Sequence, residues 1–148
     1  MENIDTSFMK EALAEAKRCF GMGEVPIGAV VVKDGEIIGR GHNTRERDHD
    51  ISGHAEINAM KEAAARLGGW NLSGCTLYVT LEPCSMCAGA ILQSRIRTLV
   101  YGLEDSEEGG LSKYHLFEYG NASTLVEGGL LKEECATLLR QFFERLRK

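Results

Sequence analysis

Two short segments, well separated along the chain, most constrain what it can fold into. The first is His54-Ala55-Glu56, and the second is Pro83-Cys84-Ser85-Met86-Cys87. One imidazole and two thiolates can hold a zinc ion, and three protein ligands leave one tetrahedral position for water. An open position of this kind is typical of a catalytic zinc site. A fold that uses these residues together must bring both segments to one place.

Each segment coincides with the predicted start of a helix. After His54 the apolar residues recur at helical spacing until Gly68-Gly69, which ends the helix. The predicted buried face of this helix carries Ile57, Met60, Ala64 and Leu67.

The cysteine segment begins a second helix, predicted over residues 85–94. Cys84 and Cys87 are three positions apart, so in a helical first turn their side chains face the same way. The unpaired N–H groups of that turn favour thiolate over thiol. Pro83 suits the position before the turn, because it ends a strand and has no N–H to leave unpaired.

The remaining elements alternate between helices and strands. A first helix is predicted from Asp5 to Phe20, with Asp5 or Thr6 as its N-cap. The Asp34-Gly35 pair lies between two β-branched runs and predicts a hairpin. Further strands are predicted at residues 75–81, 98–101 and 124–126, a helical turn at 114–117, and a last helix at 131–146. Since strand–helix–strand order favours a parallel crossover, we expect an α/β fold with a mixed sheet between helices.

Composition places the chain among ordinary globular proteins. It is 43% hydrophobic and 26% charged over 148 residues, which predicts one domain spanning residues 1–148. The chain shows neither a secretory signal nor an apolar run long enough to cross a membrane. Five cysteines without a signal indicate a reducing, cytoplasmic location. A net charge of -5 means that a nucleic-acid partner would need a local basic patch.

Two simpler interpretations compete with a catalytic zinc site. A C-x-x-C pair in an α/β protein is often a redox pair, although such a pair has no use for the upstream H-x-E. A structural zinc site would need a fourth ligand. Cys75, His42, His49 and His115 are available, but none lies at a usual ligand spacing.

The H-x-E and P-C-x-x-C signature is that of the zinc-dependent nucleobase deaminases. The flanking sequence resembles the bacterial tRNA-specific adenosine deaminases over most of the chain. The similar stretches are residues 8–16, 23–30, 41–43, 76–96, 127–131 and 133–135, with the Phe142-Phe143 pair. The resemblance implies a three-layer α-β-α, cytidine-deaminase-like fold with a five-stranded sheet and helices on both faces.

The resemblance also implies the roles of the two segments. His54, Cys84 and Cys87 are expected to bind one zinc ion per chain, and Glu56 to move protons during catalysis. Zinc lowers the pKa of its water towards neutrality, which makes hydroxide available without a strong base.

Substrate contacts follow from the same resemblance. Asn43 is expected to hydrogen-bond the base, while the backbone around Ala55 and the turn of Val25, Pro26 and Ile27 are expected to line the pocket. The family forms homodimers, for which the apolar Met86, Ala90 and Ile91 of the cysteine helix are candidates. In the alternative interpretation these three residues pack on the sheet of their own chain.

The sequence departs from the family pattern after the strand at 98–101. Asp105 is retained and is expected to contact substrate, but Glu107 and Glu108 replace a basic position on the surface that grips the anticodon loop. Carboxylates repel the phosphates that dominate nucleic-acid affinity. On the strength of the resemblance, the leading hypothesis remains deamination of the tRNA wobble adenosine. A small free base or nucleoside such as guanine or cytosine is the alternative, and a zinc-stabilised binding module is the non-enzymatic one.

Overall fold

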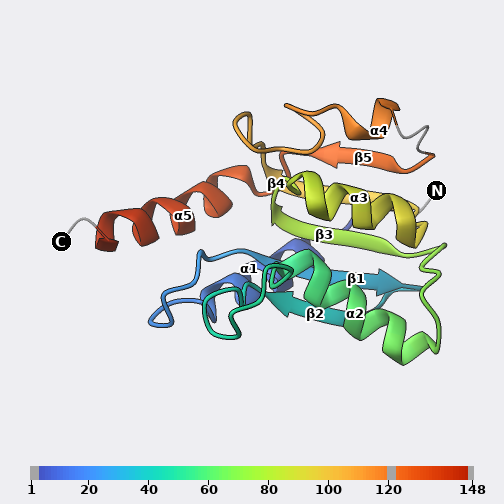
Figure 1. Ribbon diagram of the computed structural model, residues 1–148, viewed down its shortest axis with the longest axis horizontal. Coiled ribbons are helices and arrows are strands. Elements are labelled where there is room, and N and C mark those ends of the chain that lie inside the picture. The colour runs from blue at the N-terminus through green and yellow to red at the C-terminus, as the bar shows by residue number, and fades with distance from the viewer. Residues whose placement is uncertain (1–3, 120–122, 147–148) are drawn as a thin grey trace.

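The computed structural model describes residues 4–119 and 123–146 of the chain (Figure 1). Its strands form one sheet in the order β2-β1-β3-β4-β5. β1 is antiparallel to β2 and β3, whereas β3, β4 and β5 run parallel, so the predicted mixed five-stranded sheet is confirmed. The strands are β1 (Gly28–Lys33), β2 (Glu36–His42), β3 (Thr76–Leu81), β4 (Thr98–Leu103) and β5 (Leu125–Gly128).

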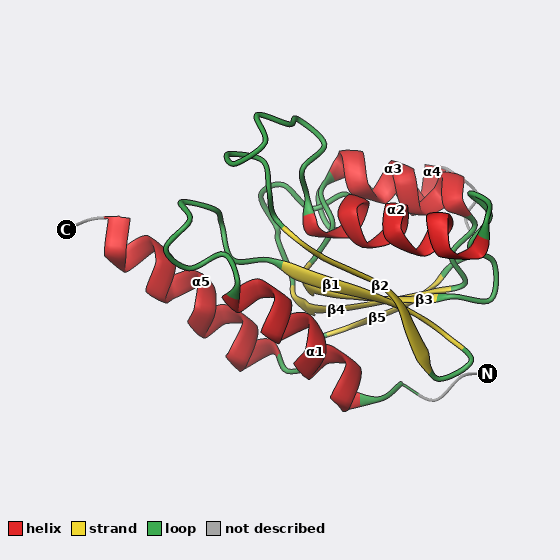
Figure 2. Cartoon of the chain, turned by 90° about the horizontal axis from the view of Figure 1, so that it is seen from below, coloured by secondary structure: helices red, strands yellow, loops and turns green. Residues whose placement is uncertain are grey.

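Helices cover both faces of this sheet, which confirms the three-layer arrangement (Figure 2). One face is covered by α2 (Ala55–Leu67) and α3 (Ser85–Ser94), with the short α4 (Leu116–Tyr119) beside α3. The other face is covered by α1 (Thr6–Lys17) and α5 (Lys132–Leu146). No helix in the described ranges is both long and apolar enough to cross a membrane.

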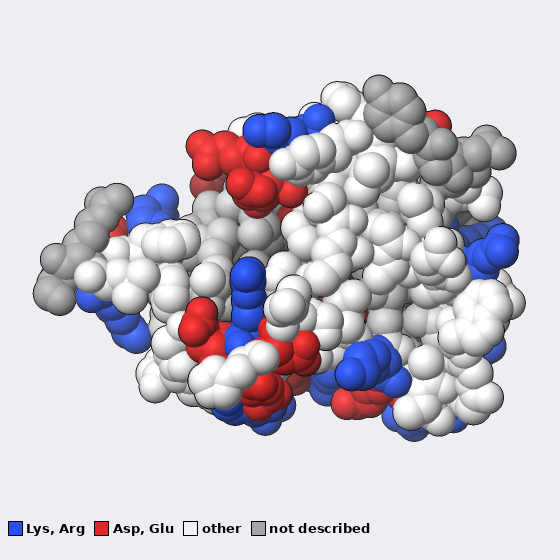
Figure 3. All heavy atoms as spheres, in the orientation of Figure 1, with Lys and Arg blue, Asp and Glu red and all other residues white. Residues whose placement is uncertain are grey.

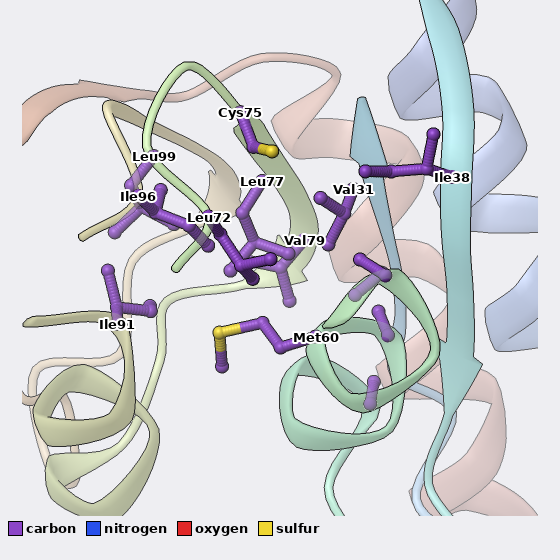
Figure 4. Close-up of a cluster of buried hydrophobic side chains, with 14 residues drawn as sticks. Val31, Ile38, Met60, Leu72, Cys75, Leu77, Val79, Ile91, Ile96 and Leu99 are labelled. Carbon is purple, nitrogen blue, oxygen red and sulfur yellow. The ribbon is translucent and has the colours of Figure 1, made fainter. Parts of the chain in front are cut away.

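The core divides into two clusters because strand residues point alternately to opposite faces of the sheet. On β1, Ala29 and Val31 pack towards α2 and α3, and Val30 and Val32 pack towards α1. Figure 4 shows the first cluster, in which Met60 of α2 lies beside the aliphatic side chains of the sheet. The side chains of both clusters are almost completely buried, and their close packing holds the helices against the sheet.

Two local predictions are confirmed by backbone geometry. Asp5 is the N-cap of α1, since its carboxylate accepts a hydrogen bond from the Ser7 N–H. Asp34 and Gly35 both have positive φ, as a two-residue hairpin between β1 and β2 requires. However, α1 ends at Lys17 and not at Phe20, and the residues after it form turns.

The buried face of α2 differs from the prediction. Its buried side chains are Ala55, Glu56, Ala59, Met60 and Ala63, while the predicted core residue Leu67 is 39% exposed. The reason lies in β2, whose glycines let α2 approach so closely that only alanine fits between them. A Cβ atom at Gly39 or Gly41 would overlap the α2 backbone.

Several boundaries in the second half of the chain also differ by one or two residues. β4 continues two residues beyond the predicted Tyr101, and α4 begins two residues after the predicted Tyr114. β5 begins at Leu125 and pairs in parallel with β4, as an edge strand. Pairing with a neighbouring strand determines the limits of β4 and β5, and short stretches carry little periodicity from which to predict any of these limits.

Candidate metal centre and catalytic cavity

Sheet topology brings the two signature segments together. β2 and β3 both run antiparallel to β1, which lies between them, so their carboxyl ends lie at the same edge of the sheet. The chain leaving β2 reaches His54, the N-cap of α2, and the chain leaving β3 reaches Cys84, the N-cap of α3. Residues separated by thirty positions thereby become neighbours.

His54, Cys84 and Cys87 converge on one point. The Nδ1 atom of His54 lies 3.5 Å from the Cys84 Sγ and 3.4 Å from the Cys87 Sγ. One donor atom from each of the three residues lies within 4.8 Å of the others, and the described residues supply no fourth donor to the group. The arrangement can hold a metal ion and leave a coordination position open.

Neither N-cap residue uses its side chain to cap its helix. His54 and Cys84 make no side-chain hydrogen bond to the first turn of α2 or α3. Serine, threonine, aspartate or asparagine at these positions would stabilise the helix by roughly 0.5–2 kcal/mol. The chain gives up that stabilisation so that an imidazole and a thiol can face the shared site.

The three donors influence each other's protonation. A hydrogen bond from Cys87 is the main reason that the pKa of Cys84 falls to about 3, with a further contribution from His54. The same bond raises the pKa of Cys87, and burial raises it further. The pKa of His54 is raised by its hydrogen bond to Cys84. Cys84 is therefore a thiolate, the form that a metal ion requires.

Glu56 lies in the first turn of α2 and is only 4% exposed. Burial raises the pKa of its carboxyl group to about 7, because the charged form loses water. Glu56 and His54 both line a cavity of about 540 Å³ that opens beside Cys84. A carboxyl group near its pKa at neutral pH is suited to accept a proton and return it.

Four of the predicted substrate-binding residues line this cavity: Asn43, Val25, Ile27 and Asp105. The side-chain oxygen of Asn43 accepts a 2.9 Å hydrogen bond from the Ala55 N–H. That bond orients the amide and leaves its nitrogen to donate towards a ligand. The contacts of these residues with a base remain predictions.

The other two predicted substrate-binding residues do not line the cavity. Pro26 is buried within the turn between Val25 and Ile27. Ala55 is completely buried at the start of α2, where its N–H holds Asn43 in place. In this structure both residues are buried next to residues that line the cavity and do not face the cavity themselves.

Two buried carboxylates in the wall were missed at the level of the sequence. Glu24 is 1% exposed and accepts hydrogen bonds from the Glu46 and Arg47 N–H groups, at 3.0 and 2.8 Å. Glu82 is 2% exposed and binds the loop after β4. The available signal was a glutamate within the apolar Leu81-Glu82-Pro83 stretch, where an acid needs a specific partner.

Comparison with known proteins places the chain in a family. The model of the MafB19-like deaminases matches residues 3–147. The tRNA-specific adenosine deaminase of Bacillus subtilis is 48% identical in an alignment of 147 positions that covers 97% of this chain and 91% of the relative. The chain belongs to the tRNA-specific adenosine deaminases. This deaminase is therefore a hydrolytic enzyme that acts on a C–N bond, and the hypothesis of a binding module without turnover is wrong.

Solved structures agree with this assignment. One, from studies of A-to-I editing by tRNA:A34 deaminases at the wobble position of transfer RNA, has a TM-score of 0.88 and 43% identity, covering 91% of this chain and all of that one. Guanine deaminase from Bacillus subtilis has a TM-score of 0.66 and 38% identity, covering 71% of this chain and 68% of that one. The cytidine-deaminase-like fold predicted from the sequence is confirmed.

Proposed function

We propose that this deaminase removes the amino group of the adenosine at the wobble position of a tRNA, forming inosine and ammonia. The observation that carries the proposal is the extent of similarity. The relative described as tRNA-specific is 48% identical over 97% of the chain, whereas two guanine deaminases are 38% identical over 71% of it and 25% identical over 96% of it. The residues around the metal centre are suited to the chemistry.

We propose that the metal is zinc, with one ion per chain. Typical bond lengths of about 2.3 Å to sulfur and about 2.0–2.1 Å to nitrogen place tetrahedral sulfur and nitrogen ligands about 3.6 Å apart. The corresponding separations here are 3.5 and 3.4 Å, so the donor atoms fit. Zinc held by His54, Cys84 and Cys87 supplies Lewis acidity that activates water for attack at neutral pH.

Glu56 carries the protons of the reaction. Its carboxylate takes a proton from the attacking water and delivers it to the ring nitrogen beside the carbon under attack. It then takes the second proton from the hydroxyl now bonded to that carbon and passes it to the departing amine, so that the C–N bond breaks, ammonia leaves and a carbonyl remains. The pKa of about 7 suits both steps, because neither protonation state is strongly favoured at neutral pH.

Asn43 and the cavity walls orient the base for this attack. The Asn43 amide is held by Ala55, adjacent to Glu56 in the chain, so substrate and proton carrier share one rigid helix start. The apolar side chains of Val25 and Ile27 offer a surface for the flat face of a base. Because the cavity is concave, the adenosine must leave the base stack of the RNA to enter it.

One observation favours the alternative substrate class, a small free base or nucleoside. The cavity wall carries Glu108 and Asp105, and the loop around them is acidic (Figure 3). A free base brings no phosphate and is not repelled there. Arg45 on the opposite loop lines the same cavity and is the basic group available to a phosphate.

We further propose that the protein is a homodimer that works in the cytoplasm as one domain, residues 1–148. An apolar groove of about 450 Å³ between α2 and α3 is lined by Ile57, Met60, Ala90 and Trp70, the last 64% exposed. Of the predicted interface residues, Ala90 lies in this groove, but Ile91 is fully buried within its own chain. A second copy would cover this apolar surface. Light scattering would test the dimer, and Trp70→Glu should yield monomers.

An ammonia-release assay separates the substrate classes. The purified protein is incubated with an anticodon stem-loop carrying wobble adenosine, and separately with free bases and nucleosides. Inosine in the stem-loop is the expected result. Ammonia from small compounds alone would overturn the tRNA assignment and establish the alternative.

A further inference from the structure

Glu82 is a buried carboxylate with an unusual number of partners. It lies between β3 and α3 and faces the catalytic cavity. Its oxygens accept hydrogen bonds from the N–H groups of Asp105, Leu111 and Ser112, at 3.1, 3.1 and 2.8 Å. They also accept a hydrogen bond from the Ser112 hydroxyl. Such charge-assisted bonds are stronger than those between neutral groups.

All these donors come from one segment, residues 105–112, which we name the β4 loop. Its middle lies against the cysteine segment, where the Gly110 N–H donates to the Pro83 carbonyl at 2.8 Å and Gly109 forms a bridge with Cys84. Gly109 also lies so close to Glu82 that a Cβ atom there would overlap the carboxylate. The hydrogen bonds to Glu82 and the close approach of Gly109 to its carboxylate therefore define the position of the β4 loop.

The same loop supplies part of the cavity wall. Asp105 and Glu108 both line the cavity, and the Asp105 carboxylate accepts from the N–H groups of Glu107 and Glu108 at 3.2 and 3.1 Å. If the loop moved away, Glu82 would lose these hydrogen-bond donors together, and each such bond to a charged group contributes net stability even when water replaces it. The hydrogen bonds to the Glu82 carboxylate therefore stabilise the position of the β4 loop in this structure.

We propose that Glu82 is a positioning residue, which acts through the β4 loop to set the substrate-facing wall of the cavity. Its role is distinct from proton transfer, which belongs to Glu56. The proposal rests on the proposed function in one respect, because the KM measurement requires the stem-loop to be a substrate. The order of the loop itself can be measured without any turnover.

Glu82→Gln is the main variant. The amide keeps the size of the side chain but turns an NH₂ group towards N–H donors, so part of the loop loses its acceptor. Glu104→Gln is the matched control. Glu104 is exposed and accepts from the same Ser112 hydroxyl at 2.9 Å, yet it lies outside the cavity lining.

Two measurements are made on both variants. Hydrogen exchange of amides 105–112 should become faster in Glu82→Gln, and KM for the stem-loop should rise about tenfold while kcat changes less than threefold. Metal content should stay at the wild-type value. Glu104→Gln should behave as wild type in every measurement.

Ser112→Ala provides a second route if Glu82→Gln does not fold. This variant removes the hydroxyl that donates to both Glu82 and Glu104, and it should raise KM by a smaller factor. Where Glu82→Gln does fold, Ser112→Ala should add almost nothing in the double variant, because both changes act through one contact. Additive effects would overturn the proposal.

Other outcomes also decide the question. Unchanged exchange and KM in Glu82→Gln would overturn the positioning role, and so would a parallel loss of kcat, metal and melting temperature, which indicates general misfolding. If the wild type itself does not turn over the stem-loop, the proposed function fails. Faster exchange confined to the β4 loop would still support the role of Glu82.

Discussion

The floor and the rim of the catalytic cavity are built differently. The floor consists of His54, Glu56, Cys84 and Cys87, which lie at the starts of α2 and α3, on helices packed firmly against the sheet. The rim consists of two loops, residues 44–53 and the β4 loop, whose outer side chains are largely exposed and charged. Rigid helix starts suit chemistry that needs exact placement, whereas loops can change with the substrate.

The two sides of the rim nevertheless share one device. Each is tied to the body of the protein by a buried glutamate that accepts backbone N–H groups, Glu24 on one side and Glu82 on the other. The loops can therefore carry variable surface charges while their backbones remain in place. We expect the floor to determine the reaction and the rim to determine which substrate reaches it.

The largest effect is expected at the floor. Glu56→Gln should reduce kcat by about 10²–10⁴-fold, because the amide cannot carry protons. Metal content should remain unchanged, since Glu56 is not among the donor residues. Stem-loop kinetics and elemental analysis would measure both. Glu62→Gln, on the exposed side of the same helix, serves as the control and should retain activity.

Cys87→Ser tests the metal centre itself. Removal of a ligand should weaken zinc binding by more than the roughly 10–100-fold seen when only an outer partner is lost. The melting temperature should fall to that of protein treated with a chelator, because metal binding stabilises the folded state. Competition with a chromogenic chelator measures the affinity. Cys135→Ala, a core change far from the site, should leave zinc affinity unaltered.

Gly41→Ala tests the support beneath the floor. The new methyl group would overlap the backbone of α2 near Ala55, so the helix that carries His54 and Glu56 must shift. Overpacking of this kind typically destabilises by about 1–3 kcal/mol, which urea unfolding would measure. Gly69→Ala has free space around its Cβ position and should be close to neutral. Equal stability of both variants would contradict the close α2–β2 contact.

The smallest effect is expected at the rim. Glu108→Lys replaces a carboxylate in the cavity wall by a cation, so stem-loop affinity should rise a few fold. The slope of log K against log salt should steepen by about 0.7, as expected for one added phosphate contact on a single strand. Binding titrations at several salt concentrations measure this slope. Glu36→Lys, at the far end of β2, makes the same charge change and should not alter it.

Much of the floor was predictable from the sequence because its information is local. The spacing within His54-Ala55-Glu56 and within Cys84 to Cys87 fits a helical first turn, and Pro83 marks where that turn begins. The Asp34-Gly35 hairpin follows in the same way from two residues that tolerate positive φ. The roles of the two cysteines and His54 as metal ligands, and of Glu56 as the proton carrier, remain predictions that the geometry supports.

The buried face of α2 was predicted only in part: Met60 lies in the core, and Ile57 and Ala64 pack against it, as the periodicity indicated. Periodicity identified Leu67 as a core residue, but the glycines of β2 draw the alanine side of the helix inward. The rotation of a helix depends on the shape of the surface it meets, which lies elsewhere in the sequence. Glu82 shows the same dependence, because its partners at Asp105, Leu111 and Ser112 follow it by more than twenty residues.

The sequence by itself determined which residues are candidates for the chemistry: one imidazole, two thiols and an acid at helix-start spacing predict a metal-assisted proton-transfer site. Only the tertiary structure decided how that site is enclosed. It buried Glu24 and Glu82, tied both rim loops to them, and placed Asp105 and Glu108 in the cavity wall. The physical reason is that a buried carboxylate needs hydrogen-bond partners, and the backbone donors that reach Glu24 and Glu82 come from loops that only the fold brings to them.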